Sequence, residues 1–332
     1  MATAWLFPGQ GSQTVGMGKA LCEYSAQARE VFQRADDTLG WSLSKLCFEG
    51  PSDELLRTAN AQPAILTISI AALAALREAY PQLQLPSYVA GHSLGEYSAL
   101  VAAGTLAFED AVRLVHLRGK AMQEAVPVGL GAMAAVMGAK VEQVVALCER
   151  AAENEVLSCA NFNAPGQVVI AGHASAVARA RSLAAELGLK VIPLKVSAPF
   201  HCTLMAPAAQ AVRDALSSIT LADARVPVIA NVEAKPHSEG KRLADLLVKQ
   251  VDAPVLWEQT VRHLADDGVV KALEIGPGNV LAGLVHRTDK RISVYGVNSP
   301  EGIEKAREFL NLEGETLKRA AQQISKEPQL FA

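Results

Sequence analysis

The stretch that decides the fold reads Val89-Ala90-Gly91-His92-Ser93-Leu94-Gly95-Glu96-Tyr97. Apolar residues 87–90 predict a short strand and residues 96–102 fit a helix, so the Gly-x-Ser-x-Gly pattern falls at a strand-to-helix turn. Two glycines permit a bend that holds the Ser93 hydroxyl exposed, and the following helix directs free N–H groups toward whatever that hydroxyl attacks. The pattern therefore predicts a nucleophilic Ser93. The alternative is an ordinary glycine turn with a solvated serine.

Length and composition limit the possible classes of protein. The chain has 332 residues, of which 50% are hydrophobic and 20% charged, with a formal net charge of −3. These values describe a soluble globular protein of one large domain with an insertion, or of two domains, and nothing in them indicates nucleic-acid binding. Residues 61–75 are too short and too polar for a membrane span, so we expect a buried helix there.

The first residues of the sequence and the cysteines suggest a reduced, intracellular environment. The first seven residues lack a basic region and a long apolar core, so we expect no signal peptide and a cytoplasmic protein. The five cysteines show neither a C-x-x-C pair nor metal-ligand spacing, which favours buried thiols and implies no metal: Cys22, Cys47, Cys148, Cys159 and Cys202.

A glycine-bracketed loop follows the first expected strand, at residues 4–7. It reads Pro8-Gly9-Gln10-Gly11-Ser12-Gln13, and such a loop suits close approach of backbone N–H groups to an anion or a developing oxyanion. It lacks the ending of a P-loop and the G-x-G-x-x-G spacing, so we do not expect nucleotide binding. As a lone motif it is more often a turn.

Residues 127–197 form a unit with its own order of elements. Strands are expected over 132–137, 155–160, 167–171 and 189–196, and helices over 141–152 and 175–187, with a turn-rich link at 161–166. This β-α-β-β-α-β order is the ferredoxin-like arrangement. We therefore expect an inserted ferredoxin-like α+β subdomain at 127–197.

The rest of the chain alternates strands and helices, which favours a mostly parallel sheet covered on both faces. The predicted fold is an α/β hydrolase-like catalytic domain, made discontinuous (1–126 and 198–332) by the insertion. The tail from Glu313 to Ala332 is polar, and we assign no function to it.

A nucleophilic serine needs a base within hydrogen-bond reach. His92 lies beside Ser93 on the turn, and its side chain should point away, so we expect it to shape the turn. His201 directly follows the insertion and precedes a helix, which places it where the two domains meet. We predict that His201 is the base. In α/β-hydrolases the triad follows the chain order Ser, Asp or Glu, His, and we find no obvious acid that fits this order. A backbone or amide carbonyl could instead orient the imidazole, leaving a Ser-His dyad.

Arg118 lies 25 residues after Ser93, on the next expected helix. Near the nucleophile, a guanidinium would bind a carboxylate through two parallel hydrogen bonds. Taken alone, an arginine on a polar helix face is usually solvated.

Together these pieces resemble the malonyl-CoA:acyl carrier protein transacylase family and the related acyltransferases of polyketide synthases. The similarity runs from Phe7-Pro8-Gly9-Gln10-Gly11-Ser12-Gln13 to Gly276-Pro277-Gly278. Between them lie the Ser93 motif, Arg118, Asn161-Phe162-Asn163-Ala164-Pro165-Gly166-Gln167 and Pro199-Phe200-His201.

The resemblance implies that Ser93 carries the malonyl group as an ester, with His201 as general base and then acid. It implies that the backbone N–H groups of Gln10 and Leu94 form the oxyanion hole and that Arg118 binds the malonyl carboxylate. In this family a backbone carbonyl replaces the triad aspartate, and the matching position is Gln250. Three further residues are expected to line the substrate pocket: Phe200, His92 and Asn161.

Substrates and partners follow from the same resemblance. Leu94 and Phe200 are bulky and apolar where methylmalonyl enzymes often carry a glutamine and a small residue, so malonyl-CoA is favoured. The second partner is an acyl carrier protein, typically acidic, whose docking could use exposed basic residues: Lys190, Lys195, Arg287, Lys290 and Arg291. We expect a monomer that uses no cofactor, no nucleic acid and no membrane, in fatty acid or polyketide biosynthesis.

Two other functions stay open from the sequence. One is a serine esterase, or an acyl hydrolase that acts on carrier-bound thioesters, although Arg118 and Phe200 argue against it. The other is a carrier-binding module with an inert serine.

Overall fold

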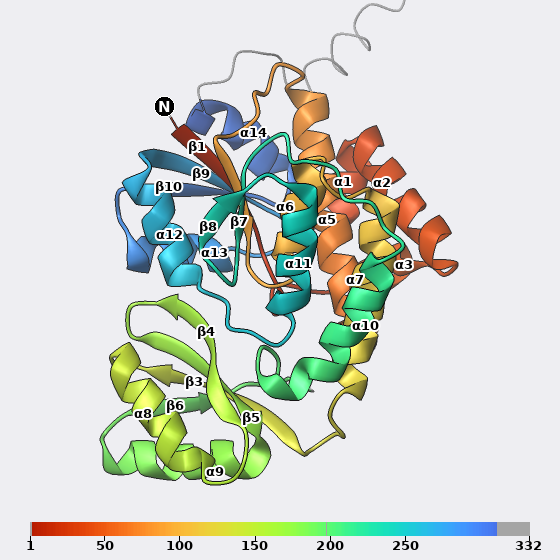
Figure 1. Ribbon diagram of the computed structural model, residues 1–332. Coiled ribbons are helices and arrows are strands. Elements are labelled where there is room, and N and C mark those ends of the chain that lie inside the picture. The colour runs from red at the N-terminus through yellow and green to blue at the C-terminus, as the bar shows by residue number, and fades with distance from the viewer. Residues whose placement is uncertain (1, 197, 311–332) are drawn as a thin grey trace, which may run out of the picture.

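The computed structural model describes residues 2–196 and 198–310, and its strands form two sheets (Figure 1). The larger sheet has the order β10-β9-β1-β2-β7-β8. Its strands are β1 (Ala2–Phe7), β2 (Tyr88–Gly91), β7 (Val228–Ala230), β8 (Lys235–His237), β9 (Val269–Ile275) and β10 (Ser293–Val297). All neighbours pair in parallel except β7 and β8, so the sheet is mostly parallel, as predicted.

Strand β1 shows why this sheet is buried on both faces. Trp5 and Phe7 belong to one hydrophobic cluster, whereas Ala4 and Leu6 belong to another. Successive side chains of a strand point to opposite faces, so each cluster marks a separate layer of helices. Helices α5 (Thr58–Ala79) and α6 (Gly95–Ala102) pack on the first face, and α12 (Trp257–Asp266) and α13 (Val280–Thr288) pack on the second.

Helix α5 is the central helix of the first layer. It is long and apolar enough to span a membrane, but 78% of its most apolar window is buried inside the fold. The other helices around this sheet are α1 (Lys19–Tyr24), α2 (Ala26–Leu39), α3 (Leu43–Glu49), α4 (Ser52–Leu56), α7 (Phe108–Glu124), α10 (Ala206–Leu216), α11 (Gly240–Gln250) and α14 (Pro300–Leu310). In Figure 1, α5 and α7 stand side by side to one side of the sheet, with α1, α2 and α3 beyond them.

The smaller sheet is antiparallel, with the order β4-β5-β3-β6. Its chain order is β3 (Gly131–Met137), α8 (Val141–Ala152), β4 (Leu157–Ala164), β5 (Gln167–His173), α9 (Ala174–Glu186) and β6 (Lys190–Pro193). This is the order of elements that the sequence predicted. Helices α8 and α9 cover one face, and a third hydrophobic cluster lies between them and the sheet.

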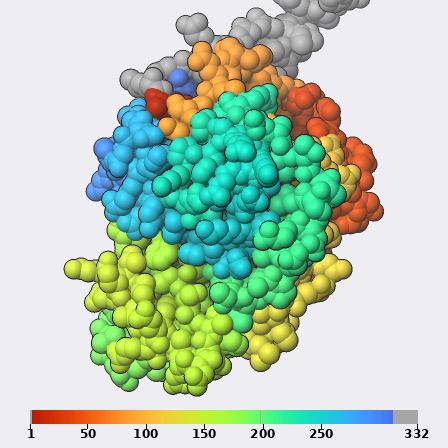
Figure 2. Space-filling model, viewed as in Figure 1, coloured from red at the N-terminus to blue at the C-terminus, as the bar shows by residue number. Residues whose placement is uncertain are grey.

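Strand β4 meets the larger part of the molecule directly. Phe162 N–H donates to the Val255 carbonyl at 2.9 Å and Val255 N–H donates to the Ala160 carbonyl at 2.9 Å. In Figure 2 the yellow-green residues of this part lie against the blue and teal residues above them. The assignment of 127–197 as a separate inserted subdomain between 1–126 and 198–332 stays a prediction.

Four details of the predicted elements were wrong. Residues 161–164 continue strand β4 instead of forming a turn, because the backbone bonds with Val255 extend the strand past a register shift and confine the turn to Pro165 and Gly166. Strand β6 ends at Pro193 rather than at 196. Strand β8 and the short helix α1 were not predicted. The polar tail from Glu313 lies outside the described residues.

Candidate active site

Ser93 lies at the sharp turn between β2 and α6, with φ of 51°. Such a left-handed conformation is rare for a residue other than glycine and is tolerated only where the surroundings enforce it. The surroundings are tight: a Cβ atom on Gly91 would lie 1.9 Å from the Gly95 carbonyl carbon, and one on Gly95 would lie 2.0 Å from the Phe7 carbonyl oxygen. The two glycines therefore let α6 return against β1 and β2, which fixes the position of Ser93.

The hydroxyl of Ser93 donates to Nε2 of His201 at 2.7 Å, and Nδ1 of His201 donates to the Gln250 carbonyl at 2.8 Å. A carbonyl oxygen can only accept, so the proton lies on Nδ1 and the lone pair of Nε2 faces the serine. Burial and, to a smaller extent, the Arg118 charge lower the pKa of His201 to about 3, although the bond to Gln250 opposes the shift. The imidazole is therefore neutral at neutral pH and able to accept the serine proton.

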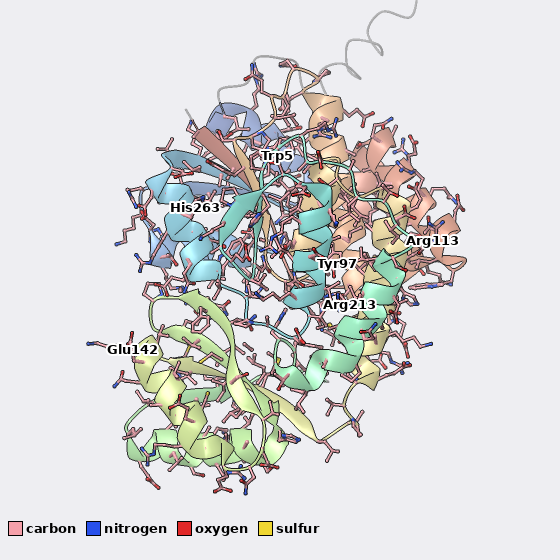
Figure 3. The ribbon with its side chains drawn as sticks, in the orientation of Figure 1. Trp5, Tyr97, Arg113, Glu142, Arg213 and His263 are labelled. Carbon is pink, nitrogen blue, oxygen red and sulfur yellow. The ribbon has the colours of Figure 1, made fainter. Side chains whose placement is uncertain are left out.

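Arg118 points from α7 toward the same hydroxyl. Its Nη2 donates to Ser93 Oγ at 3.2 Å and to Gln250 Oε1 at 2.8 Å, and its Nη1 donates to Gln62 Oε1 at 2.8 Å. The guanidinium is 1% exposed and lies 5.3 Å from the ring centroid of Tyr97, which is labelled in the interior of the larger part in Figure 3. Burial lowers the pKa of Arg118, while Tyr97 and Glu96 oppose that shift.

A cavity of about 490 Å³ opens above these residues. Most of the residues expected at the site line it: Gln10, His92, Ser93, Arg118, Asn161, Phe200 and His201. Leu94 and Gln250 do not line the cavity. Leu94 is the residue before the first turn of α6, so its N–H has no partner within that helix.

His92, on the turn, contacts strand β4 of the smaller sheet. His92 Nε2 lies 2.8 Å from Asn163 Oδ1, and its ring centroid lies 5.6 Å from that of Trp257. The imidazole is thus directed away from Ser93, toward β4. Desolvation lowers the pKa of His92. Asn161, which the sequence placed on a turn, stands on strand β4 and is 7% exposed.

The expected basic residues are spread over several elements. Lys195 lines the cavity, Lys190 begins β6, and Arg287 lies in the last turn of α13. Arg291 forms ion pairs with Asp289 and Asp266, so it is less available to a partner. In residues 2–196 and 198–310, no cluster of three or more His, Cys, Asp or Glu side chains could hold a metal ion.

Comparisons with known proteins identify the family of the chain. The family described as "Acyl transferase domain" matches residues 4–312. The chain belongs to the acyl transferase family. It is 47% identical over 308 residues to the malonyl CoA-acyl carrier protein transacylase of Haemophilus influenzae, covering 92% of this chain and 98% of that protein.

Solved acyl transferases have the same fold. An acyl-carrier-protein-S-malonyltransferase from Bartonella henselae superposes with a TM-score of 0.91 at 45% identity, covering 94% of this chain and 100% of that chain. A malonyl-transacylase solved in complex with a type II PKS acyl-carrier protein gives a TM-score of 0.90 at 42% identity, covering 93% of this chain and 100% of that one. The hydrolase-like α/β fold expected from the sequence is confirmed.

Several polar residues of this acyl transferase site were missed from the sequence. Asn231, just after β7, accepts from Ser93 N–H through Oδ1 at 2.7 Å and donates through Nδ2 to the Gly91 carbonyl at 2.6 Å. Gln62 and Glu96 are buried polar residues in the apolar helices α5 and α6. A polar side chain inside an apolar helical run was the signal that could have indicated them.

Proposed function

We propose that this chain transfers the malonyl group of malonyl-CoA to the phosphopantetheine thiol of an acyl carrier protein through an ester on Ser93. The observation that carries the proposal is the chain of contacts from Gln250 through His201 to Ser93, beside the buried Arg118. The first part activates a serine, and the second supplies a cation where the acyl group would lie. Residues 4–312 match the family model, and the relatives that bear this activity in their names are similar along almost their entire length.

In the first half of the reaction, His201 Nε2 takes the proton of Ser93 as Oγ attacks the thioester carbonyl. The oxyanion accepts hydrogen bonds from the backbone N–H groups of Gln10 and Leu94. The intermediate collapses, the C–S bond breaks, and the coenzyme A thiolate takes the proton from His201. Malonyl-Ser93 and free coenzyme A result.

In the second half, the carrier thiol enters and gives its proton to His201 Nε2. The thiolate attacks the ester carbonyl, the C–O bond to Ser93 breaks, and Oγ recovers the proton. Water must be kept from the ester until the thiol arrives.

Arg118 selects the substrate in this proposal. Two amide oxygens and one aromatic ring hold the guanidinium, so its charge is free to pair with the malonyl carboxylate. An acetyl group would leave that buried charge unpaired. Phe200, which lines the cavity, restricts the space beside the acyl carbon and favours malonyl over methylmalonyl.

The proposal is tested by exposing the protein briefly to malonyl-CoA and locating the adduct by mass spectrometry, then adding carrier protein with its phosphopantetheine arm. We expect malonyl on Ser93, followed by malonyl-carrier, and no adduct in Ser93→Ala. Arg118→Ala should lose malonyl loading while acetyl loading is retained or improved. Free malonate without malonyl-carrier would instead indicate a hydrolase, and absence of any adduct would indicate a carrier-binding module.

The proposed setting is the cytoplasm, with a monomeric enzyme that acts without a cofactor. The donor brings its own pantetheine thioester and the acceptor its own pantetheine thiol, so the other groups that the chemistry needs all belong to the chain. Comparing retention on a sizing column with that of standards of known mass tests the monomer.

A further inference from the structure

Glu96 is a buried carboxylate without a role in the chemistry proposed above. It is the second residue of α6 and is 1% exposed. Its Oε2 accepts from Asn231 N–H at 3.1 Å and from Gln250 Nε2 at 2.8 Å, while its Oε1 has no partner among the described residues. Burying a carboxylate with so few donors is costly, so its place directly behind the nucleophile calls for an explanation.

The side-chain amide of Gln250 links Glu96 to the substrate-binding arginine. Its Nε2 donates to Glu96 Oε2 and to the Ser93 carbonyl, both at 2.8 Å, and its Oε1 accepts from Arg118 Nη2 at 2.8 Å. Two acceptors lie on one side of the amide and a donor lies on the other. Only one of its two orientations satisfies all three groups.

The amide also keeps the two charges apart. Within the described residues, no carboxylate oxygen lies within ion-pair distance of Arg118. A direct ion pair would place a permanent carboxylate where the substrate carboxylate is expected to bind. With Gln250 between them, Glu96 offsets part of the buried positive charge without occupying the donors of the guanidinium.

We propose that Glu96 is a positioning residue that acts through Gln250. Its Oε2 fixes the amide so that Gln250 Oε1 faces Arg118, which aims the guanidinium at the cavity and leaves its charge for the substrate carboxylate. The inference rests on the proposed malonyl transfer, and it assigns Glu96 no contact with substrate.

Three variants separate this role from a purely structural one. Glu96→Ala removes one of the two acceptors of Gln250 Nε2, so only the Ser93 carbonyl holds that side of the amide, and the amide and the Arg118 guanidinium bonded to it can shift. Misplacing the arginine should lower kcat/KM for malonyl-CoA loading by about 10- to 100-fold, mainly through KM, and change acetyl-CoA loading by about twofold or less. Glu96→Gln keeps an acceptor oxygen in the same place and should restore malonyl loading to within about threefold of wild type.

The matched control is Ser98→Ala on the same helix. Ser98 is fully buried and its hydroxyl has no hydrogen-bond partner among the described residues, so the variant changes the α6 interior without touching the polar contacts. Both loading reactions should remain at wild-type rates. Equal loss of malonyl and acetyl loading in Glu96→Ala, or failure of Glu96→Gln to restore the malonyl reaction, would overturn the inference.

A crystal structure of Glu96→Ala distinguishes failure of this inference from failure of the proposed function. If wild type loads no malonyl group, the proposed function is wrong, whatever the variants do. If the Gln250 amide and the Arg118 guanidinium keep their wild-type positions in Glu96→Ala, the positioning role is wrong, whatever the substrate. Displacement of the Gln250 amide and the Arg118 guanidinium, together with selective loss of malonyl loading, is the expected result.

Discussion

Two regions meet at Ser93, and their construction differs. The turn from Gly91 to Glu96 is built from adjacent residues, and its shape depends on two positions where any Cβ atom would clash with backbone. The polar scaffold behind it consists of Gln62, Glu96, Arg118 and Gln250, and its hydrogen bonds join residues as far apart as 157 positions. The turn presents the nucleophile, whereas the scaffold aligns the groups around it.

The difference shows which kind of change each region can tolerate. A turn enforced by backbone contact fails as a whole, because no side chain can move aside to relieve a backbone clash. A scaffold of polar side chains can lose one bond and keep its fold, but its alignment and charge then change. We therefore expect defects in folding from the turn and defects in substrate selection from the scaffold.

The largest effect should come from Gly95→Ala. The new Cβ atom would lie 2.0 Å from the Phe7 carbonyl oxygen and 2.9 Å from that of Pro8, so α6 must move away from β1. We expect a loss of about 4 kcal/mol or more in the free energy of unfolding, or no soluble protein. Urea denaturation followed by circular dichroism measures it.

Gly283→Ala is the matched control for that prediction. Gly283 is an exposed helical glycine of α13, and a Cβ atom there would meet no atom within 4 Å. It should stabilise the protein by about 0.5–1 kcal/mol, since alanine is the better helix former. A Gly95→Ala protein as stable as wild type would show that the turn is not enforced by its contacts.

The second effect should come from the scaffold, through Gln250→Glu. A carboxylate at this position would pair with Arg118 directly, and Glu96, whose pKa is raised to about 7 by burial, could hold a proton and donate to it. Because the new carboxylate would pair with Arg118 in place of the malonyl carboxylate, malonyl would bind poorly. We expect kcat/KM for malonyl-CoA to fall by about 100-fold while acetyl-CoA loading persists. Steady-state kinetics with both substrates provide the measurement.

Gln210→Glu makes the same chemical change on the exposed face of α10 and should leave both reactions unchanged. If Gln250→Glu loads malonyl as well as wild type does, the separation of Glu96 from Arg118 has no functional meaning. In that case the scaffold would serve stability alone.

The same contrast explains how much the sequence could predict. The turn at Ser93 and the alternation of strands and helices depend on local patterns, which the sequence carries openly. That His201 would meet Ser93 followed from its place after the expected insertion, and a role for the Gln250 carbonyl followed only from the family resemblance. The geometry now places both in one chain of contacts.

Features that depend on distant partners were missed. Residues 161–164 looked like a turn because of their composition, but a strand bridge to Val255, far along the chain, keeps them extended. The contacts of Gln62 and Asn231 likewise exist only after α5, α7 and β7 have packed. No local pattern encodes which polar side chain will meet which, so the scaffold required the structure.

The third prediction removes the bond that ties the turn to the sheet. In Asn231→Ala the N–H of Ser93 and the carbonyl of Gly91 lose their side-chain partners, which should lower the free energy of unfolding by about 1–3 kcal/mol. Because Ser93 is then held less firmly, the rates of malonyl and acetyl loading should fall together. Denaturation and loading kinetics on the same samples test both statements.

Asn298→Ala is the control, since its Nδ2 donates to the Gly278 carbonyl at 3.0 Å, away from Ser93. It should reduce stability with unchanged loading rates. Loss of malonyl loading alone in Asn231→Ala would instead place Asn231 with Arg118 and not with the turn.

The last prediction concerns the ionisation of Glu96, where turn and scaffold share one residue. Desolvation raises its pKa to about 7, against the lowering effects of Gln250, Asn231 and Arg118, whereas the unfolded chain should show the ordinary value of 4.5. Between these values the folded protein holds a proton that the unfolded chain has released. Stability from this group is therefore present below pH 4.5, declines as the pH rises toward 7, and is constant above.

Glu96→Gln cannot ionise, so the difference in free energy of unfolding between wild type and this variant isolates the group from all others. That difference should shift against wild type by at most about 1.4 kcal/mol per pH unit across the window and then level off. Urea denaturation of both proteins through the window measures it. A constant difference would mean that Glu96 ionises alike in both states. A shift in favour of wild type would mean that Arg118, acting through Gln250, stabilises the Glu96 anion more than burial destabilises it. The main contribution of the scaffold would then be the attraction between these two charges.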